Sequence, residues 1–214
     1  MKLYGFWRSS AAYRVRIALA LKRLSYDYAS VQLAKGEQYQ SAFSAINPQS
    51  LVPVLEDEGH LLYQSLAIIQ YLEETHPEPR LIPEDALGRN RVRSLALIVA
   101  CEIHPLNNPR VLNYLTDNFA VSEEQKLAWY QHWVTTGFTA LEKRLAGEPW
   151  TGRYCHGDTP GLADIALVPQ VANAKRFKVD LAPFPTLCRI NEACLKLEAF
   201  QKAAPENQPD AEKK

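Results

Sequence analysis

The chain has 214 residues, which suits one large domain or two small ones, and 47% of them are hydrophobic, enough to bury a substantial core. Lysine plus arginine and aspartate plus glutamate number 24 each, so the formal net charge is zero. A neutral chain has no global field that attracts nucleic acid or an anionic membrane, and we expect neither as a partner. Any anion must therefore bind at a local cluster.

The ends and the cysteines bear on the cellular compartment. The first ten residues, MKLYGFWRSS, lack the apolar run of a signal peptide. No stretch approaches the roughly 18 apolar residues of a spanning helix. Four cysteines lack CxxC spacing and nearby paired histidines, so we expect free thiols and no metal site. They are Cys101, Cys155, Cys188 and Cys194. These features predict a soluble cytoplasmic protein.

Residues 1–80 alternate between strand and helix patterns. Their apolar periodicities and turn signals predict the order β-α-β-α-β-β-α. The predicted strands are 2–7, 26–33, 51–57 and 60–64, and the predicted helices are 11–22, 38–47 and 65–76. The strand-helix-strand start requires a parallel pair with a right-handed crossover. The last two strands, joined at Glu58-Gly59, form an antiparallel edge.

Beyond residue 80 the pattern becomes helical. Pro77, Pro79 and Pro83 make a stiff connection, and we predict a linker over 81–87. Long helical periodicities follow in a second domain, predicted over 88–214. They cover 87–118, 123–146, 162–177 and 186–204. The polar end, APENQPDAEKK, is predicted to fray.

A proline interrupts the strand predicted over 51–57. Pro53 cannot donate to a strand ladder, which confines it to an edge or a bulge. A cis Val52-Pro53 bond would turn the Val52 backbone outward as a free donor and acceptor. An ordinary trans proline at a sheet edge fits the sequence equally well.

Two helix starts are candidate anion sites. Ser65 stands at the cap of the helix predicted over 65–76, where free N–H groups and the helix dipole favour a carboxylate, with Gln64 beside it. The alternative is that Ser65 only caps this helix and binds no ligand. Ser9 and Ser10 precede the helix predicted over 11–22, where the dipole and a hydroxyl would stabilise a thiolate. No cysteine lies in that segment, so a ligand must bring the thiol.

These three features together suit an extended thiol peptide. An outward strand backbone, a carboxylate site and a thiolate site are what glutathione requires, so the residues predict glutathione as the ligand.

Several segments resemble one family. FWRSSAAYRVRIAL, NPQSLVPVL, QSLAIIQYLEE, CEIHPLNNPRVL and GLADIALVPQVANAKRF occur in order over residues 1–204. Together they resemble zeta-class glutathione transferases, in particular the bacterial maleylacetoacetate and maleylpyruvate isomerases. The resemblance implies an α+β chain with a thioredoxin-like N-terminal domain, an all-α C-terminal domain (the glutathione transferase fold) and a homodimer.

The resemblance also implies site residues. The glutathione sulfur would lie beside Ser9 and Ser10, its cysteinyl backbone beside Val52 and a cis-Pro53, and its γ-glutamyl carboxylate on Gln64 and Ser65. Further glutathione contacts would come from Gln38, His104, Asn108 and Arg110. The substrate carboxylates would be held by Arg8, Arg110 and Arg176, whose planar guanidinium groups suit a dianion.

The chemistry implied by the resemblance is cis-trans isomerisation. The thiolate adds to the double bond of a maleyl ketoacid, the new single bond rotates, and elimination gives the fumaryl product with glutathione regenerated as a cofactor. The arginines would also stabilise the enolate formed after addition. The expected reaction is maleylacetoacetate to fumarylacetoacetate, in catabolism of the aromatic amino acids tyrosine and phenylalanine.

Some residues depart from the family pattern or have structural explanations. Ala11 replaces a cysteine that many members carry, and Gly161 replaces a capping hydroxyl. Pro109 is expected to kink the helix that carries Arg110. Asp164 is expected to anchor a helix start rather than to act as a base.

Three other functions remain open. Maleylpyruvate isomerase of gentisate-type degradation would use the same arginines. A general glutathione transferase acting on haloacids would use the same thiolate but consume glutathione. A non-catalytic binding module is disfavoured, because such proteins tend to lose the hydroxyl and carboxylate sites that are present here.

Overall fold

The computed structural model describes residues 1–212, which form two compact units. The first unit contains Met1–Leu81 together with the chain from Leu195 onward, and the second contains Ile82–Cys194. The sequence placed residues 88–214 in one helical domain. The grouping differs because the last helix packs on the first unit.

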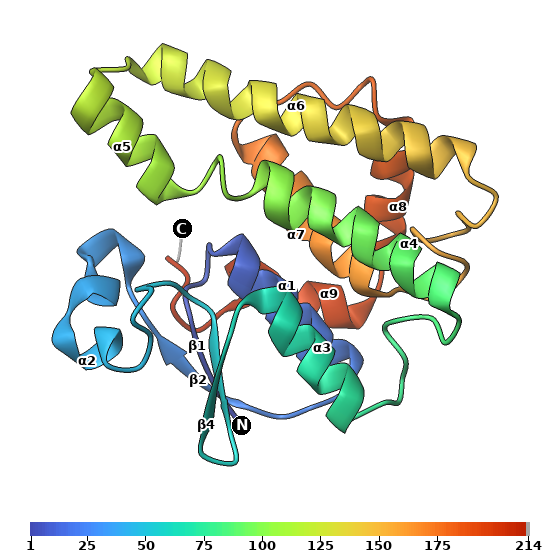
Figure 1. Ribbon diagram of the computed structural model, residues 1–214, viewed down its shortest axis with the longest axis horizontal. Helices are drawn as coiled ribbons and strands as arrows, with labels where there is room; N and C mark the ends of the chain where they lie inside the picture. Colours follow the sequence, from blue (N-terminus) through green and yellow to red (C-terminus); the bar gives the residue numbers. More distant parts are fainter. Residues whose placement is uncertain (213–214) are drawn as a thin grey trace. The chain divides into compact units, whose positions relative to one another are not determined.

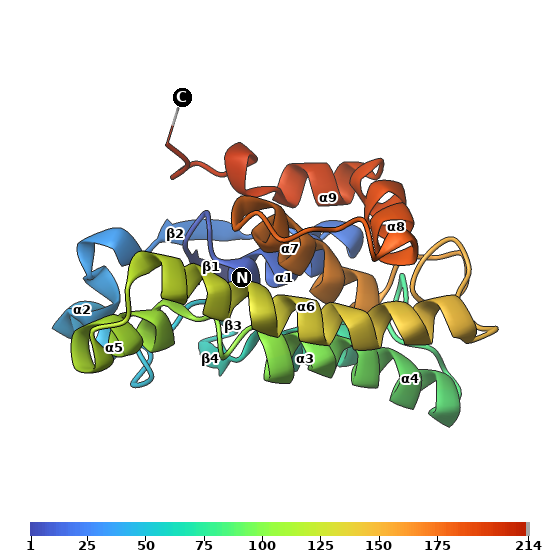
Figure 2. The ribbon, with the colours of Figure 1, turned by 90° about the horizontal axis from the view of Figure 1, so that it is seen from above.

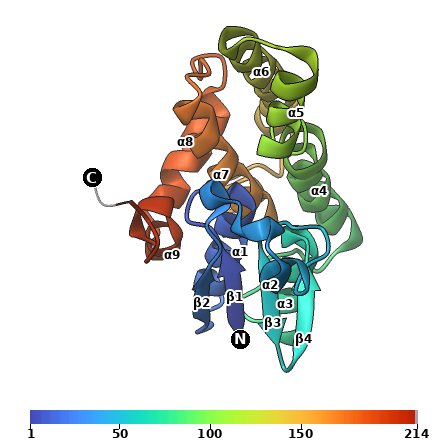
Figure 3. The same ribbon diagram turned by 90° about the vertical axis from the view of Figure 1, so that its left-hand side faces the viewer.

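The first unit is built on a four-stranded mixed sheet in the order β2-β1-β3-β4 (Figure 3). The strands are β1 (Lys2–Gly5), β2 (Asp27–Ser30), β3 (Val54–Asp57) and β4 (His60–Tyr63). The β1–β2 pair is parallel, and β3 runs antiparallel to both of its neighbours. The predicted parallel first pair and antiparallel last pair are thereby confirmed.

Three helices of the predicted N-terminal pattern accompany this sheet (Figure 1). They are α1 (Ser10–Leu21), the single-turn α2 (Ser41–Ser44) and α3 (Ser65–Thr75). Short 3-10 turns at η1 (Leu33–Lys35) and η2 (Glu37–Tyr39) precede α2. The helix predicted over 38–47 is therefore shorter than its pattern suggested.

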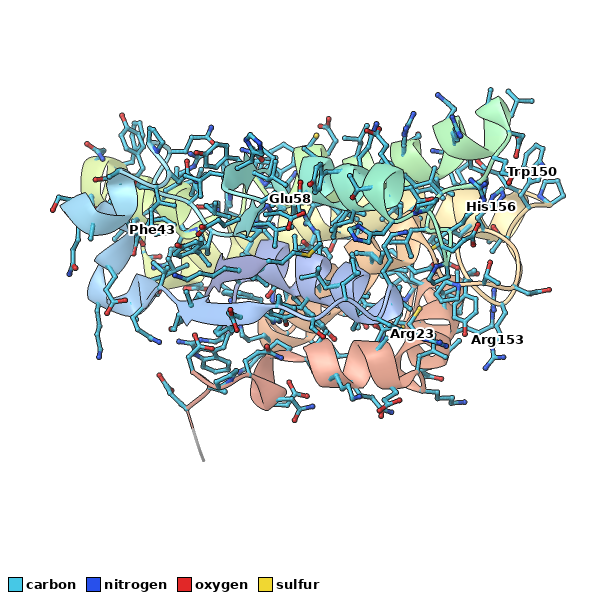
Figure 4. All side chains as sticks on the ribbon, turned by 90° about the horizontal axis from the view of Figure 1, so that it is seen from below. Arg23, Phe43, Glu58, Trp150, Arg153 and His156 are labelled. Atoms are coloured by element: carbon cyan, nitrogen blue, oxygen red, sulfur yellow. The ribbon has the colours of Figure 1, made fainter. Side chains whose placement is uncertain are left out.

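Alternation along β1 divides the core of this unit between the two faces of the sheet. Leu3 is fully buried, and Gly5 lies against Ala12 of α1, whereas Tyr4 points the other way and packs its ring against Phe43 of α2. This period of two is the geometry of a strand covered on both faces. Phe43 is labelled on α2 in Figure 4.

The C-terminal segment completes the first unit. Helix α9 (Glu198–Ala203) packs against α1, and the 3-10 turn η4 (Pro205–Asn207) follows it (Figures 1 and 2). The single helix predicted over 186–204 is thus divided into α8 (Pro185–Leu195) and α9. The prediction that the tail frays is wrong for residues 204–212, because these residues make contacts that a polar sequence does not reveal.

The second unit is helical, as predicted. Its helices are α4 (Ala86–Leu97), the π-helical η3 (Ile98–Ile103), α5 (Pro109–Phe119), α6 (Glu123–Gly147), α7 (Leu162–Arg176) and α8. The single helix predicted over 87–118 is interrupted at 104–108. Pro109 occupies the first turn of α5, where a missing N–H costs nothing, so it starts a helix instead of kinking one.

A buried arginine and a buried aspartate order the loop between α6 and α7. Arg91 donates to Thr151 Oγ1 at 2.7 Å, and its guanidinium also contacts His156. Asp164 accepts from the backbone N–H groups of Cys155 and Gly161 at 2.8 and 2.9 Å. Asp164 therefore anchors the start of α7, as predicted; Trp150, Arg153 and His156 mark the loop in Figure 4.

Within residues 1–212, none of the helices is both long and apolar enough to cross a bilayer.

Candidate functional site

The sheet directions bring four predicted segments to one edge of the first unit. Because β1 and β2 are parallel and β4 reverses twice relative to β1, all three strands end at the same edge, while β3 begins there. Ser9 follows β1, Gln38 follows β2, Val52 precedes β3 and Ser65 follows β4. The predicted glutathione contacts of this unit thus converge on one sheet edge.

Ser9 forms the thiol end of this candidate site. It is the N-cap of α1, and its Oγ accepts from Ala12 N at 3.2 Å. The oxygen is the acceptor in this bond. The hydroxyl proton is therefore still available for donation to an anion in front of the helix. Ser10 is buried as the first helical residue, whereas Ser9 is half-buried. Of the two predicted sulfur contacts, Ser9 is therefore the more exposed.

Arg8 lies next to this end. Its side chain is exposed, with the guanidinium 4.8 Å from the centroid of the Trp7 ring. Stacking on an indole limits the rotamers of a long side chain without neutralising its charge. Arg8 is therefore a cation available at the thiol end.

The carboxylate end is the start of α3. Ser65 is 7% exposed, and the Arg14 guanidinium of α1 donates to its Oγ at 3.4 Å. Because Arg14 fills an acceptor position of the oxygen, the Ser65 hydroxyl can donate to a ligand. The structure thus places the buried charge of Arg14 next to the candidate carboxylate site.

Gln64 precedes Ser65 with a backbone that most residues avoid. Its φ is 65° and its ψ 114°, outside the regions normal for a side chain with a Cβ. Such outliers concentrate at ligand sites, where surrounding contacts hold them. The Gln64 side-chain amide donates to Gln49 Oε1 at 2.9 Å, which restrains this side chain next to the start of α3.

Val52 and Pro53 lie just before β3, in the middle of this edge. The Val52-Pro53 bond is cis, which resolves the alternative left open by the sequence and agrees with the family resemblance. Asn47, which is buried, donates to the Leu51 carbonyl at 2.8 Å and so fixes the approach to Val52. Gln38 belongs to the 3-10 turn η2, which follows β2, and its Oε1 is buried without a hydrogen-bond partner among the described residues. A ligand donor would satisfy this oxygen.

These features test whether glutathione fits. The starts of α1 and α3 each offer N–H groups and a hydroxyl to an anion, and the buried Arg14 guanidinium adds positive charge at the start of α3. The buried Gln38 Oε1 can accept a hydrogen bond from a ligand. A thiolate at α1, a carboxylate at α3 and an amide between them would satisfy all of these groups. The residues present fit glutathione.

The remaining predicted residues lie on helices of the second unit. His104 follows η3 and is half-buried; Asn108 is the N-cap of α5 and accepts from Arg110 N at 3.1 Å. Arg110 is exposed on the first turn of α5. Arg176, exposed in the last turn of α7, stacks on Phe177 at 4.7 Å. The structure thus brings Asn108 and Arg110 together and places Arg176 on a different helix.

Tyr130 gives this region a buried phenol. Its ring stacks on Phe177 with centroids 3.7 Å apart. Burial raises the pKa of Tyr130 to about 12, against the opposing charge of Arg176, so the hydroxyl stays protonated at neutral pH. The aromatic pair supports the end of α7 and provides no base.

Among residues 1–212, no group of three or more histidine, cysteine, aspartate or glutamate side chains could hold a metal ion. All four cysteines are free. Burial, and then the neighbouring Asp164, raise the pKa of the Cys155 thiol well above its ordinary value, which disfavours the nucleophilic thiolate form.

Sequence reasoning missed the residues behind the site. Arg14 and Asn47 are buried and support Ser65 and the chain before Val52 through hydrogen bonds. In the sequence, the only sign of such a role is a polar residue among apolar neighbours. The Arg16 guanidinium donates to the Trp7 carbonyl at 3.0 Å, within the loop that carries Ser9. No sequence pattern indicated that contact.

Comparisons with known proteins give one consistent result. Residues 3–80 match the family "Glutathione S-transferase, N-terminal domain" and residues 134–193 match its C-terminal counterpart. A maleylpyruvate isomerase from Ralstonia sp is 53% identical over 211 residues, which cover 99% of this chain and all of that protein.

Solved structures agree with these matches. A bacterial zeta-class maleylpyruvate isomerase in its holo form superimposes with a TM-score of 0.97 at 52% identity, covering 99% of this chain and 100% of that one. A maleylacetoacetate isomerase from Anaeromyxobacter dehalogenans, with glutathione bound in its active site, gives a TM-score of 0.89 at 49% identity, covering 99% and 97%. In another crystal, that protein holds dicarboxyethyl glutathione and citrate.

Proposed function

Since this chain belongs to the glutathione S-transferase family, we propose that it is a glutathione-dependent isomerase that converts a maleyl ketoacid to its fumaryl isomer. Maleylacetoacetate is the first candidate substrate and maleylpyruvate the second. The observation that carries the proposal is the pair of helix starts at one sheet edge, with the Ser9 hydroxyl at one and the Arg14-supported Ser65 hydroxyl at the other.

The first unit would bind and ionise glutathione. Gln64 and Ser65 would hold its γ-glutamyl carboxylate, and the Val52 backbone would pair with its central residue. The Ser9 hydroxyl and the first N–H groups of α1 would stabilise the sulfur as an anion. When bound, glutathione supplies the thiolate that adds to the substrate double bond and leaves after rotation, so it is regenerated.

The arginines would hold the substrate. A maleyl ketoacid is a dianion, and each guanidinium can clamp one carboxylate through two parallel hydrogen bonds. Arg8, Arg110 and Arg176 are exposed cations of the chain that match family positions. The same groups would stabilise negative charge that develops on substrate oxygens as the double bond is attacked.

Two further properties belong to this proposal. A homodimer is expected from the family resemblance. Leu87 and Leu97 on α4 are 80% and 45% exposed in the single chain, and apolar side chains that a second protomer would cover are exposed in this way. A mass in solution near twice 24.2 kDa would support it. A cytoplasmic location accords with four free thiols, and cell fractionation tests it.

The decisive test follows the absorbance of each substrate with purified protein, with and without glutathione. Decay of maleylacetoacetate or maleylpyruvate that requires glutathione but leaves its concentration unchanged would support the isomerase and identify the substrate. Loss of one glutathione per substrate, or turnover only with haloacids, would indicate a conjugating transferase. If neither acid reacts and calorimetry detects no glutathione binding, the isomerase proposal is wrong and a binding module is favoured.

A further inference from the structure

The loop that carries the thiol end is fixed by the C-terminal segment of the chain. Asp210 Oδ2 accepts from the Trp7 backbone N–H at 3.1 Å and from the Ser30 hydroxyl at 2.9 Å. Trp7 lies two residues before Ser9, and Ser30 is the last residue of β2. One carboxylate therefore joins the end of the chain to the loop after β1 and to the neighbouring strand.

A second anchor holds the other side of the same residue. Arg16, which is 1% exposed, donates through Nη2 to the Trp7 carbonyl at 3.0 Å and through Nε to the Ala203 carbonyl at 2.9 Å. The N–H and C=O of Trp7 are thus both bound, one by Asp210 and the other by Arg16. Both anchors depend on the segment after α8, since Ala203 ends α9 and Asp210 follows η4.

The environment makes Asp210 more than a surface contact. Burial lowers the pKa of Arg16, and Asp210 is among the groups whose charge opposes that effect. Burial also raises the pKa of the Tyr28 hydroxyl, to which the Asp210 charge adds. A carboxylate oxygen that accepts two hydrogen bonds, in the field of a desolvated guanidinium, occupies one defined position.

We propose that Asp210 is a positioning residue for the thiol site: together with Arg16 it fixes the Trp7 peptide and hence the direction of the Ser9 hydroxyl and of Arg8. This inference rests on the proposed glutathione-dependent function. The physical reason is that a hydroxyl stabilises an anion only within a narrow range of distance and angle. A loop released by loss of Asp210 would keep Ser9 but no longer direct it.

The test compares Asp210→Ala, Asp210→Asn and the control Glu212→Gln, which removes one exposed carboxylate from the same segment. For each variant, the ultraviolet absorbance of the thiolate of bound glutathione is titrated against pH, and kcat and KM are measured with thermal unfolding. We expect Asp210→Ala to move the thiol titration upward by about one pH unit and to lower kcat about 10- to 100-fold, with a smaller change in the KM for substrate.

The asparagine variant keeps an oxygen that can accept from Trp7 N–H but loses the charge. Its titration should therefore lie between those of wild type and Asp210→Ala, and it remains informative if the alanine variant does not fold. Glu212→Gln should match wild type.

A lower unfolding temperature in the Asp210 variants with an unchanged thiol titration and kcat would overturn the inference, since Asp210 would then only stabilise the fold. Equal effects of Glu212→Gln would also overturn it, because they would arise from overall charge. Failure of the wild-type protein to bind or ionise glutathione is a different result: it would refute the proposed function itself.

Discussion

Replacing Ser9 by alanine tests the assignment of the thiol end. The hydroxyl has one role in the structure and a second in the proposed site. Its oxygen caps α1 through Ala12 N at 3.2 Å, and its proton would be donated to the glutathione sulfur. Alanine removes both. Loss of the cap should lower the free energy of unfolding by about 1 kcal/mol, as at other helix starts.

The expected effect on the ionisation of bound glutathione is larger than the effect on stability. A hydrogen bond to a charged group contributes about 1.5–3 kcal/mol, and one pKa unit corresponds to about 1.4 kcal/mol. Loss of the Ser9 donor should therefore raise the pKa of the bound glutathione thiol by about 1–2 units. The N–H groups and the dipole of α1 remain, so the thiol should still ionise more readily than in water.

The assay is a pH titration of thiolate absorbance in the complex with glutathione, beside denaturant unfolding. Ser9→Thr, which retains a hydroxyl and a capping oxygen, should restore most of the wild-type titration, and Ser10→Ala should leave it unchanged because Ser10 is buried in the first helical turn. A shift in Ser10→Ala, or an unshifted titration in Ser9→Ala despite the lost stability, would refute the reasoning.

Three other predictions address the remaining parts of the molecule. Ser65→Ala should weaken glutathione binding in calorimetry about tenfold or more, while binding of the dipeptide Cys-Gly, which lacks the γ-glutamyl carboxylate, stays the same. Arg176→Ala should raise the KM for the maleyl substrate without changing glutathione affinity, and the exposed control Arg153→Ala should change neither; an equal loss of glutathione affinity would mean that Arg176 does not act on substrate. Burial alone would raise the pKa of Glu148, but hydrogen bonds and charge from arginines, Arg144 foremost, lower it overall. Because a lowered folded-state pKa stabilises the protein above that pKa, stability should fall as pH drops below the ordinary value of 4.5, and chemical unfolding of Glu148→Gln should show a flatter pH dependence there.

The order of elements in the first unit was predictable because local patterns determine it. Period-two alternation, the cap at Ser9 and the turn at Glu58-Gly59 each act over a few residues. The predicted cap at Ser65 is wrong by one position: Gln64 is the N-cap of α3, and Ser65 is its first helical residue. The thiol and carboxylate ends followed from the two predicted helix starts, since a helix start exposes its N–H groups wherever it lies. The residue types alone therefore predicted an extended thiol peptide as ligand.

Other features depend on tertiary structure, because local sequence patterns do not determine them. Whether Pro53 is cis depends on its neighbours in the fold, and which of Ser9 and Ser10 caps α1 depends on where that helix begins. The interruption at 104–108 and the division of 186–204 were hidden because apolar periodicity continues across both breaks.

The C-terminal segment shows this limit most clearly. From sequence, the residues around Asp210 are polar, contain proline and lack an apolar face, which predicts fraying. In the structure, Asp210 meets Trp7, more than 200 positions earlier in the chain, at a distance of 3.1 Å. Sequence determines which groups can pair, but a single hydrogen bond between distant segments has no periodicity, so only the folded chain shows that the end of this protein holds the loop that begins its site.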